Sequence, residues 1–92
     1  MNPPEQTVPR KLDDVSPEEK RELDRRRQAY KDAVEEWIAA IRKEEDLANP
    51  DHSMAAVEAW EHAHFAEEDA RTRAKQFRQE YQDELREVLF HF

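Results

Sequence analysis

The clearest candidate for chemistry in this sequence is the segment Glu61-His62-Ala63-His64. Glu61 and His64 are three residues apart, and residues with that spacing lie on the same face of an α-helix. A carboxylate oxygen and an imidazole nitrogen are both ligands for first-row transition metals. On a helix, this pair can therefore hold a divalent metal ion or iron.

The Glu61–His64 spacing resembles half of the di-iron site of ferritin-like proteins, in which a Glu-x-x-His pair is combined with a glutamate from another helix. The resemblance extends over about 30 residues and implies, as in the encapsulated ferritins, a dimer of two-helix chains. By distance from the expected turn, Glu35 or Glu36 would be the ligand from the first helix. By helical phase, Glu45 lies on the inner face of that helix.

The helical phase of the second half of the chain points to a further ligand. At 100° per residue, Glu61 lies about 140° and His64 about 80° from the centre of the apolar stripe, whereas Glu67 lies nearly on it. Metal ligands in helical bundles project inward, so the phase favours Glu67 and disfavours Glu61. The alternative for all three residues is a solvated or ion-paired helix surface, in which Glu67 would pair with Arg71 or with Arg78 of a partner.

Other enzymatic chemistry finds little support. The chain has no glycine for a phosphate-binding loop and no cysteine for a thiol nucleophile or a zinc knuckle. Its only serines, Ser16 and Ser53, stand where helix caps are expected. We expect a protein that is not an enzyme and needs no cofactor, with the metal site as the alternative. The chain has four histidines, His52, His62, His64 and His91.

Two long helices must position these residues. Ser16, Pro17 and Glu19 form a capping box with proline at the first helical position, which predicts a helix over 17–48. Asn49-Pro50 predicts a turn over 49–52, and the next helix should cover 53–90. Residues 1–15 hold three of the five prolines and few apolar side chains, so we expect a disordered tail there.

The apolar side chains recur every three or four residues and form one stripe on each helix. Helices of about 32 and 40 residues would be roughly 48 and 60 Å long, too long for a compact domain of this size. The fold class is therefore all-α: a long antiparallel two-helix hairpin within residues 16–92, which we expect to dimerise into a four-helix bundle. Phe65 lies off the stripe and suggests a second contact surface. The expected interface residues are Trp37, Ile41, Trp60, Ala63, Phe65, Phe77, Tyr81, Leu85, Leu89 and Phe92.

Charge and hydropathy narrow the possible partners. The formal net charge of −8 disfavours nucleic acid, and no apolar run is long enough to span a membrane. The N-terminus lacks the features of a signal peptide, so we expect a cytoplasmic protein. The resulting interpretation is a non-enzymatic helical interaction or scaffold module that acts as a homodimer. The alternatives are a ferritin-like metal-binding bundle with a carboxylate and histidine site at the dimer interface, and an acidic decoy for a basic or nucleic-acid-binding protein.

Overall fold

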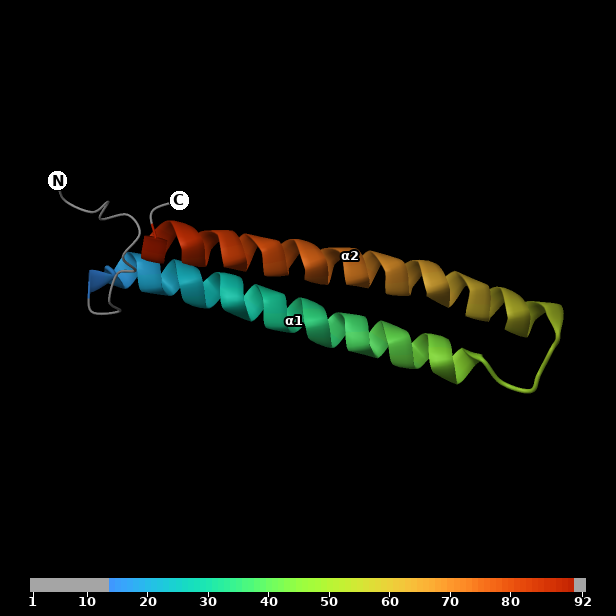
Figure 1. Ribbon diagram of the computed structural model, residues 1–92. Coiled ribbons are helices and arrows are strands. Elements are labelled where there is room, and N and C mark those ends of the chain that lie inside the picture. Colours follow the sequence, from blue (N-terminus) through green and yellow to red (C-terminus); the bar gives the residue numbers. More distant parts are fainter. Residues whose placement is uncertain (1–13, 91–92) are drawn as a thin grey trace.

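The computed structural model describes residues 14–90, which form two packed α-helices (Figure 1). Helix α1 covers Pro17–Leu47 and helix α2 covers Met54–Phe90. The described part of the chain contains no strand, so the all-α hairpin predicted from the sequence is confirmed. Residues 1–13 of the expected tail, and Phe92 of the expected interface, lie outside the described residues.

Helix α1 begins at the expected capping box. The Ser16 hydroxyl oxygen accepts a hydrogen bond from the backbone N–H of Glu19 at 3.1 Å, and the Ser16 N–H donates to the Glu19 carboxylate at 3.0 Å. Pro17 occupies the first helical position, where its missing N–H would have had no partner within the helix. This start of the helix follows entirely from local sequence.

Three side chains shape the turn between the helices. The side chains of Asn49 and Asp51 accept hydrogen bonds from the backbone N–H groups two residues onward, at 2.9 Å in each case. Ser53 then caps α2 by accepting from the N–H of Ala56 at 3.2 Å. Because Ser53 is the cap, the helical residues of α2 start at Met54. Helix α1 ends at Leu47, one residue before the expected end, and Ala48 is its C-cap.

The hairpin has a narrow core made of small residues. Small side chains let two helices approach closely, but they bury little apolar surface. Val15 belongs to this core, so the expected disordered tail does not extend to Val15. Ala63 also packs inside the hairpin and offers no surface to a partner, contrary to its expected place in a dimer interface. The buried hydrophobic residues, each at most 7% exposed, are Val15, Ala33, Ala63, Ala70, Ala74 and Val88.

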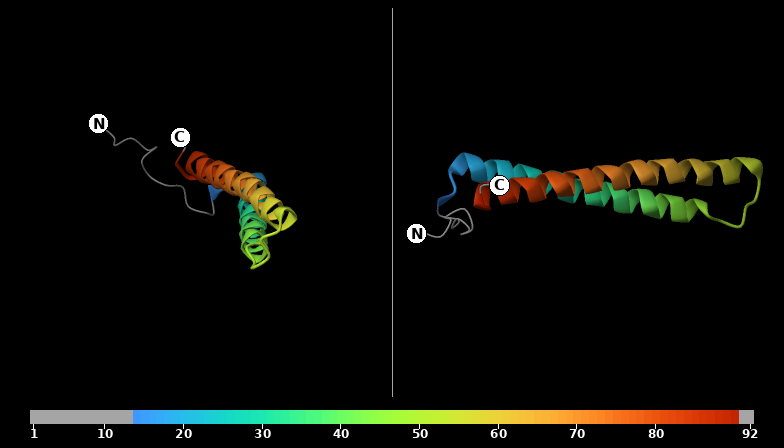
Figure 2. Two further views of the ribbon diagram at one scale, coloured as in Figure 1. Left: turned by 90° about the vertical axis from the view of Figure 1, so that its right-hand side faces the viewer. Right: turned by 45° about the horizontal axis from the view of Figure 1, so that its top comes forward.

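The described molecule is a thin rod and not a globule. It measures 72 × 27 × 14 Å and has a radius of gyration of 20.2 Å, whereas a compact chain of this length would have about 12 Å. The helices lie in one layer and cross at a shallow angle, with the start of α1 beside the end of α2 (Figures 1 and 2). Neither described helix combines the length and the apolarity that a membrane span requires.

Candidate functional site

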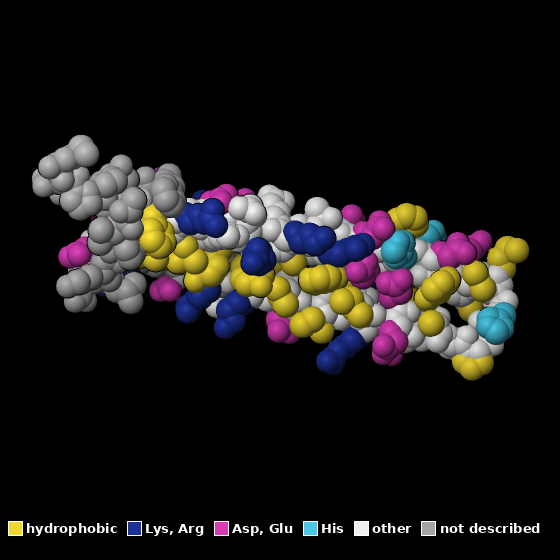
Figure 3. Space-filling view, viewed as in Figure 1, with side chains coloured by type: hydrophobic (Ala, Val, Ile, Leu, Met, Phe, Trp, Pro, Cys, Tyr) yellow, Lys and Arg dark blue, Asp and Glu magenta, His cyan; other side chains and the backbone are white. Residues whose placement is uncertain are grey.

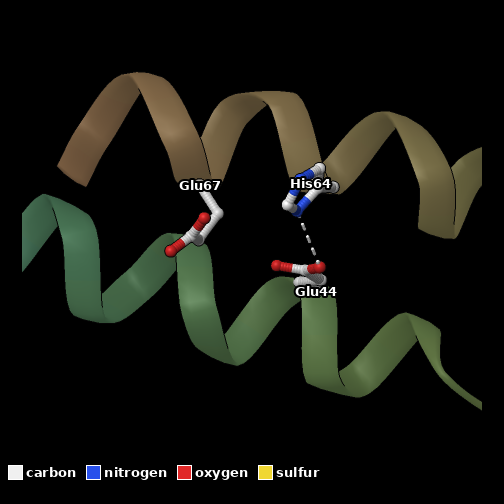
Figure 4. Close-up of side chains that lie close together, drawn as sticks. All are labelled: Glu44, His64 and Glu67. Atoms are coloured by element: carbon white, nitrogen blue, oxygen red, sulfur yellow. Dashed lines mark ion pairs between the residues drawn. The ribbon is translucent and has the colours of Figure 1, made fainter. Parts of the chain in front are cut away.

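Three potential metal ligands meet near the turn end of the hairpin. Glu44 projects from α1, and His64 and Glu67 project from α2 (Figure 4). One ligand atom from each residue lies within 4.8 Å of the other two. The imidazole Nδ1 of His64 lies 3.4 Å from Oε1 of Glu44. We call these three residues the Glu44–His64–Glu67 cluster.

Neighbouring side chains hold two members of the cluster in place. Nε2 of His64 lies 2.9 Å from a carboxylate oxygen of Glu68. Glu67 accepts a hydrogen bond from the indole N–H of Trp37 at 3.1 Å, and its second oxygen lies 3.4 Å from the Arg71 guanidinium. The sequence had left two partners open for an inward-facing Glu67, and in this chain it is paired with Arg71. Each side chain of the α2 half of the cluster is therefore oriented by a polar partner.

Of the expected metal ligands, the structure brings His64 and Glu67 together and places Glu61 outside the group. Glu61 instead lines a groove of 440 Å³ beside the cluster, together with Glu44, Trp60, His64 and Phe65. Glu61 and His64 lie on the same side of α2. By helical phase, however, Glu61 lies further than His64 from the apolar stripe that faces α1.

The glutamate from the first helix is not one of those expected. Glu36 lies 3.8 Å from Arg73, away from His64, and Glu35 and Glu45 are exposed outside the cluster. Glu44 takes the place expected of them. A signal for it was present in the sequence, because Glu44 stands seven residues after Trp37 and so shares its inward-facing side of α1.

In the absence of a metal ion, the same residues can form an ion-pair network. A protonated imidazole has two N–H donors, and those of His64 would point at Glu44 and Glu68. A neutral imidazole donates from one nitrogen and offers a lone pair on the other, which is the form that binds a metal. Either a proton on Nδ1 or a metal ion can therefore bridge His64 and Glu44 in this geometry.

Large hydrophobic side chains are exposed beside the cluster. Ile41 and Trp60 are each 42% exposed, and Ile38 is 37% exposed. Ile41 precedes Glu44 by three residues and Trp60 precedes His64 by four, so both lie on the side of the hairpin where the cluster is found. A band of hydrophobic side chains follows the junction of the helices on this side (Figure 3). We call this the apolar face; half-buried residues at helical spacing extend it, namely Leu23, Tyr30, Val34, Leu85 and Leu89.

The remaining expected interface residues divide into two groups. Trp37, Phe77 and Tyr81 are half-buried against the opposite helix or at its edges. Phe65 is 61% exposed and comes two residues after the buried Ala63, a step that carries its side chain to the outer side of α2. Phe65 also lines the groove next to Trp60, so it borders the apolar face without belonging to its central band.

Comparison with known proteins assigns the chain to no family. No protein-family model, no curated protein and no solved structure matches it. Its function is therefore inferred from the Glu44–His64–Glu67 cluster and the apolar face.

Proposed function

We propose that the chain is a non-enzymatic helical interaction module that works as a homodimer, in which the apolar faces of two hairpins pack into a four-helix bundle. The exposure of Ile38, Ile41 and Trp60 on one side of the hairpin carries this proposal. Contiguous exposed apolar surface of this kind usually marks an interaction site.

The core between the two helices is too narrow to bury the large hydrophobic side chains of the hairpin. Within the described residues, the buried hydrophobic side chains are four alanines and two valines, whereas Ile38, Ile41 and Trp60 stay exposed. The smallest dimension of the hairpin, 14 Å, is close to the diameter of one helix with its side chains. The molecule is therefore a single layer of helices. A second layer on the apolar face would bury the side chains that a single layer leaves in water.

The distribution of charge favours a second copy in antiparallel orientation as the occupant. The half of the hairpin nearer the turn, residues 37–68, carries eight acidic and only two basic side chains. The other half, residues 14–36 and 69–90, carries thirteen acidic and eleven basic side chains. Most of the Lys and Arg side chains visible in Figure 3 accordingly lie away from the turn. Antiparallel packing puts each acidic half against a basic-rich half, which lowers the repulsion that parallel packing would create.

The mass of the protein in solution tests the proposal. We expect light scattering at micromolar concentration to give twice the 11.0 kDa mass of one chain. Ile41→Ser should shift the protein towards the single-chain mass, because a hydroxyl replaces apolar surface that the dimer buries. The helix content, measured by circular dichroism, should be retained, because Ile41 is partly exposed in the hairpin itself.

Met54→Ser is the matched control, since Met54 is 78% exposed at the start of α2 and lies outside the apolar face. We expect this variant to keep the dimer mass. A wild-type protein with the mass of a single chain would overturn the proposal. An Ile41→Ser variant that dimerises as well as the wild type would place the interface elsewhere.

A further inference from the structure

We propose that Glu44, His64 and Glu67 form a binding site for one divalent first-row transition metal ion of the zinc type. All three ligands belong to one chain, so this site does not depend on the proposed dimer. Its donors are one imidazole nitrogen and two carboxylate oxygens, a set that such ions bind readily.

The spacing of the donors suits a small, four-coordinate ion. Bonds of about 2.0–2.2 Å in a tetrahedral arrangement place neighbouring ligand atoms roughly 3.3 Å apart. Nδ1 of His64 and Oε1 of Glu44 are already 3.4 Å apart. Glu67 contributes an oxygen within 4.8 Å of both, so a small rotation of its side chain completes a three-residue ligand set.

The surroundings of His64 distinguish this group from an ordinary acidic patch. Metal-binding histidines commonly donate their second ring N–H to a carboxylate, which fixes the ring and leaves the other nitrogen free for the metal. Glu68 stands in that position, 2.9 Å from Nε2 of His64. Nδ1 is thereby left to point towards Glu44, as a metal ligand must (Figure 4).

The surroundings of Glu67 also allow a metal ion to enter. The Trp37 N–H orients one carboxylate oxygen, while Arg71 reaches the other. Arg71 also lies 3.8 Å from Glu68, so it keeps an acidic partner when Glu67 turns towards the ion. The coordination position that remains can be filled by water, because Glu44 and His64 also line the open groove next to Trp60.

Titration calorimetry with zinc chloride on the full-length chain tests the site. We expect one Zn²⁺ per chain, with His64→Ala weakening the binding by at least about tenfold. Glu44→Gln and Glu67→Gln should weaken it similarly, because each removes a charged donor. His62→Ala and Glu61→Gln are the matched controls, since both residues are exposed neighbours outside the cluster, and both variants should bind like the wild type.

Three outcomes would overturn the proposal. The first is the absence of Zn²⁺ binding by the wild type. The second is equal weakening by His62→Ala and His64→Ala, which would indicate non-specific binding by surface histidines. The third is one ion for two chains that is lost in Ile41→Ser, because the ligands would then come from two chains. The metal site and the dimer are thus tested separately: one ion per chain would support the site whether or not the wild type dimerises.

Discussion

The hydrogen bond from Trp37 to Glu67 is the most specific polar contact between the two helices. The Glu67 side chain is only 13% exposed, so its carboxylate has lost most of its contact with water. The Trp37 N–H and the Arg71 guanidinium replace that water. A half-buried carboxylate beside an apolar seam favours one alignment of the helices, because sliding either helix by one turn would remove the Trp37 donor and leave only Arg71, on the same helix, as a partner.

Removing the indole donor should therefore destabilise the hairpin. We expect Trp37→Phe to lower the free energy of unfolding by about 1.5–3 kcal/mol, the usual range for a hydrogen bond to a charged group. Urea unfolding followed by circular dichroism measures the loss. Trp60→Phe makes the same change of side chain at a position that is 42% exposed, and it should cost less. Equal losses for the two variants would show that ring size matters here and the hydrogen bond does not.

At the scale of the helices, the alanines of α2 set the distance to α1. Ala70 and Ala74 are each 3% exposed, and Ala33 on α1 is equally buried. A methyl group on each side lets the helices pack closely, and it leaves no room for a larger side chain. The larger apolar side chains lie beside this seam, where they remain partly exposed.

Enlarging one alanine of the seam should force the helices apart. We expect Ala74→Leu to lower the free energy of unfolding by about 1–3 kcal/mol, as overpacking usually does. Ala66→Leu on the same helix replaces an exposed alanine and should change stability little. Thermal unfolding of the two variants under identical conditions makes the comparison. Similar melting temperatures for both would contradict close packing at Ala74.

The sequence predicted the helices well because their limits depend on local chemistry. Ser16 and Glu19 form the expected capping box, and Ser53 caps the second helix as expected. Glu22 and Arg26, whose spacing of four residues favours an ion pair within one helix, lie 2.9 Å apart. Such features need only the neighbouring residues, which a sequence displays directly.

Contacts between the helices were harder to predict, because they depend on the alignment of residues across the turn. Asp69 stands four residues before Arg73, a spacing that favours an ion pair within one helix, but Arg73 reaches across to Glu36 at 3.8 Å. Glu44 was missed as the neighbour of His64 for the same reason. An alanine stripe also looks the same whether it faces the other helix of the hairpin or a partner, and Ala63 faces the former.

At the scale of the whole molecule, the hairpin is a single layer with unlike ends. Most of its net negative charge lies near the turn, because nearly all the described basic side chains lie in the other half. This asymmetry is the reason for expecting two copies to pack antiparallel. In that arrangement the two turns lie at opposite ends of the dimer.

The distance between the two turns measures this orientation directly. Because the chain has no cysteine, His52→Cys introduces a single thiol at the exposed turn, where a nitroxide spin label can be attached. We expect pulsed electron paramagnetic resonance to give a distance between the two spin labels of the dimer that approaches the 72 Å length of the hairpin. A short separation would mean that the turns lie together and the dimer is parallel.

The start of α1 and the end of α2 lie at the same end of the rod, and this determines how the molecule responds to a mechanical load (Figure 1). Tension applied between Pro17 and Phe90 would open the helix pair like a zipper, one turn at a time. Val88, near that end, would separate first, and Trp37 and Glu67 would follow. The contact between His64 and Glu44, near the turn, would break last. A metal ion bound there would therefore resist the final separation of the two helices.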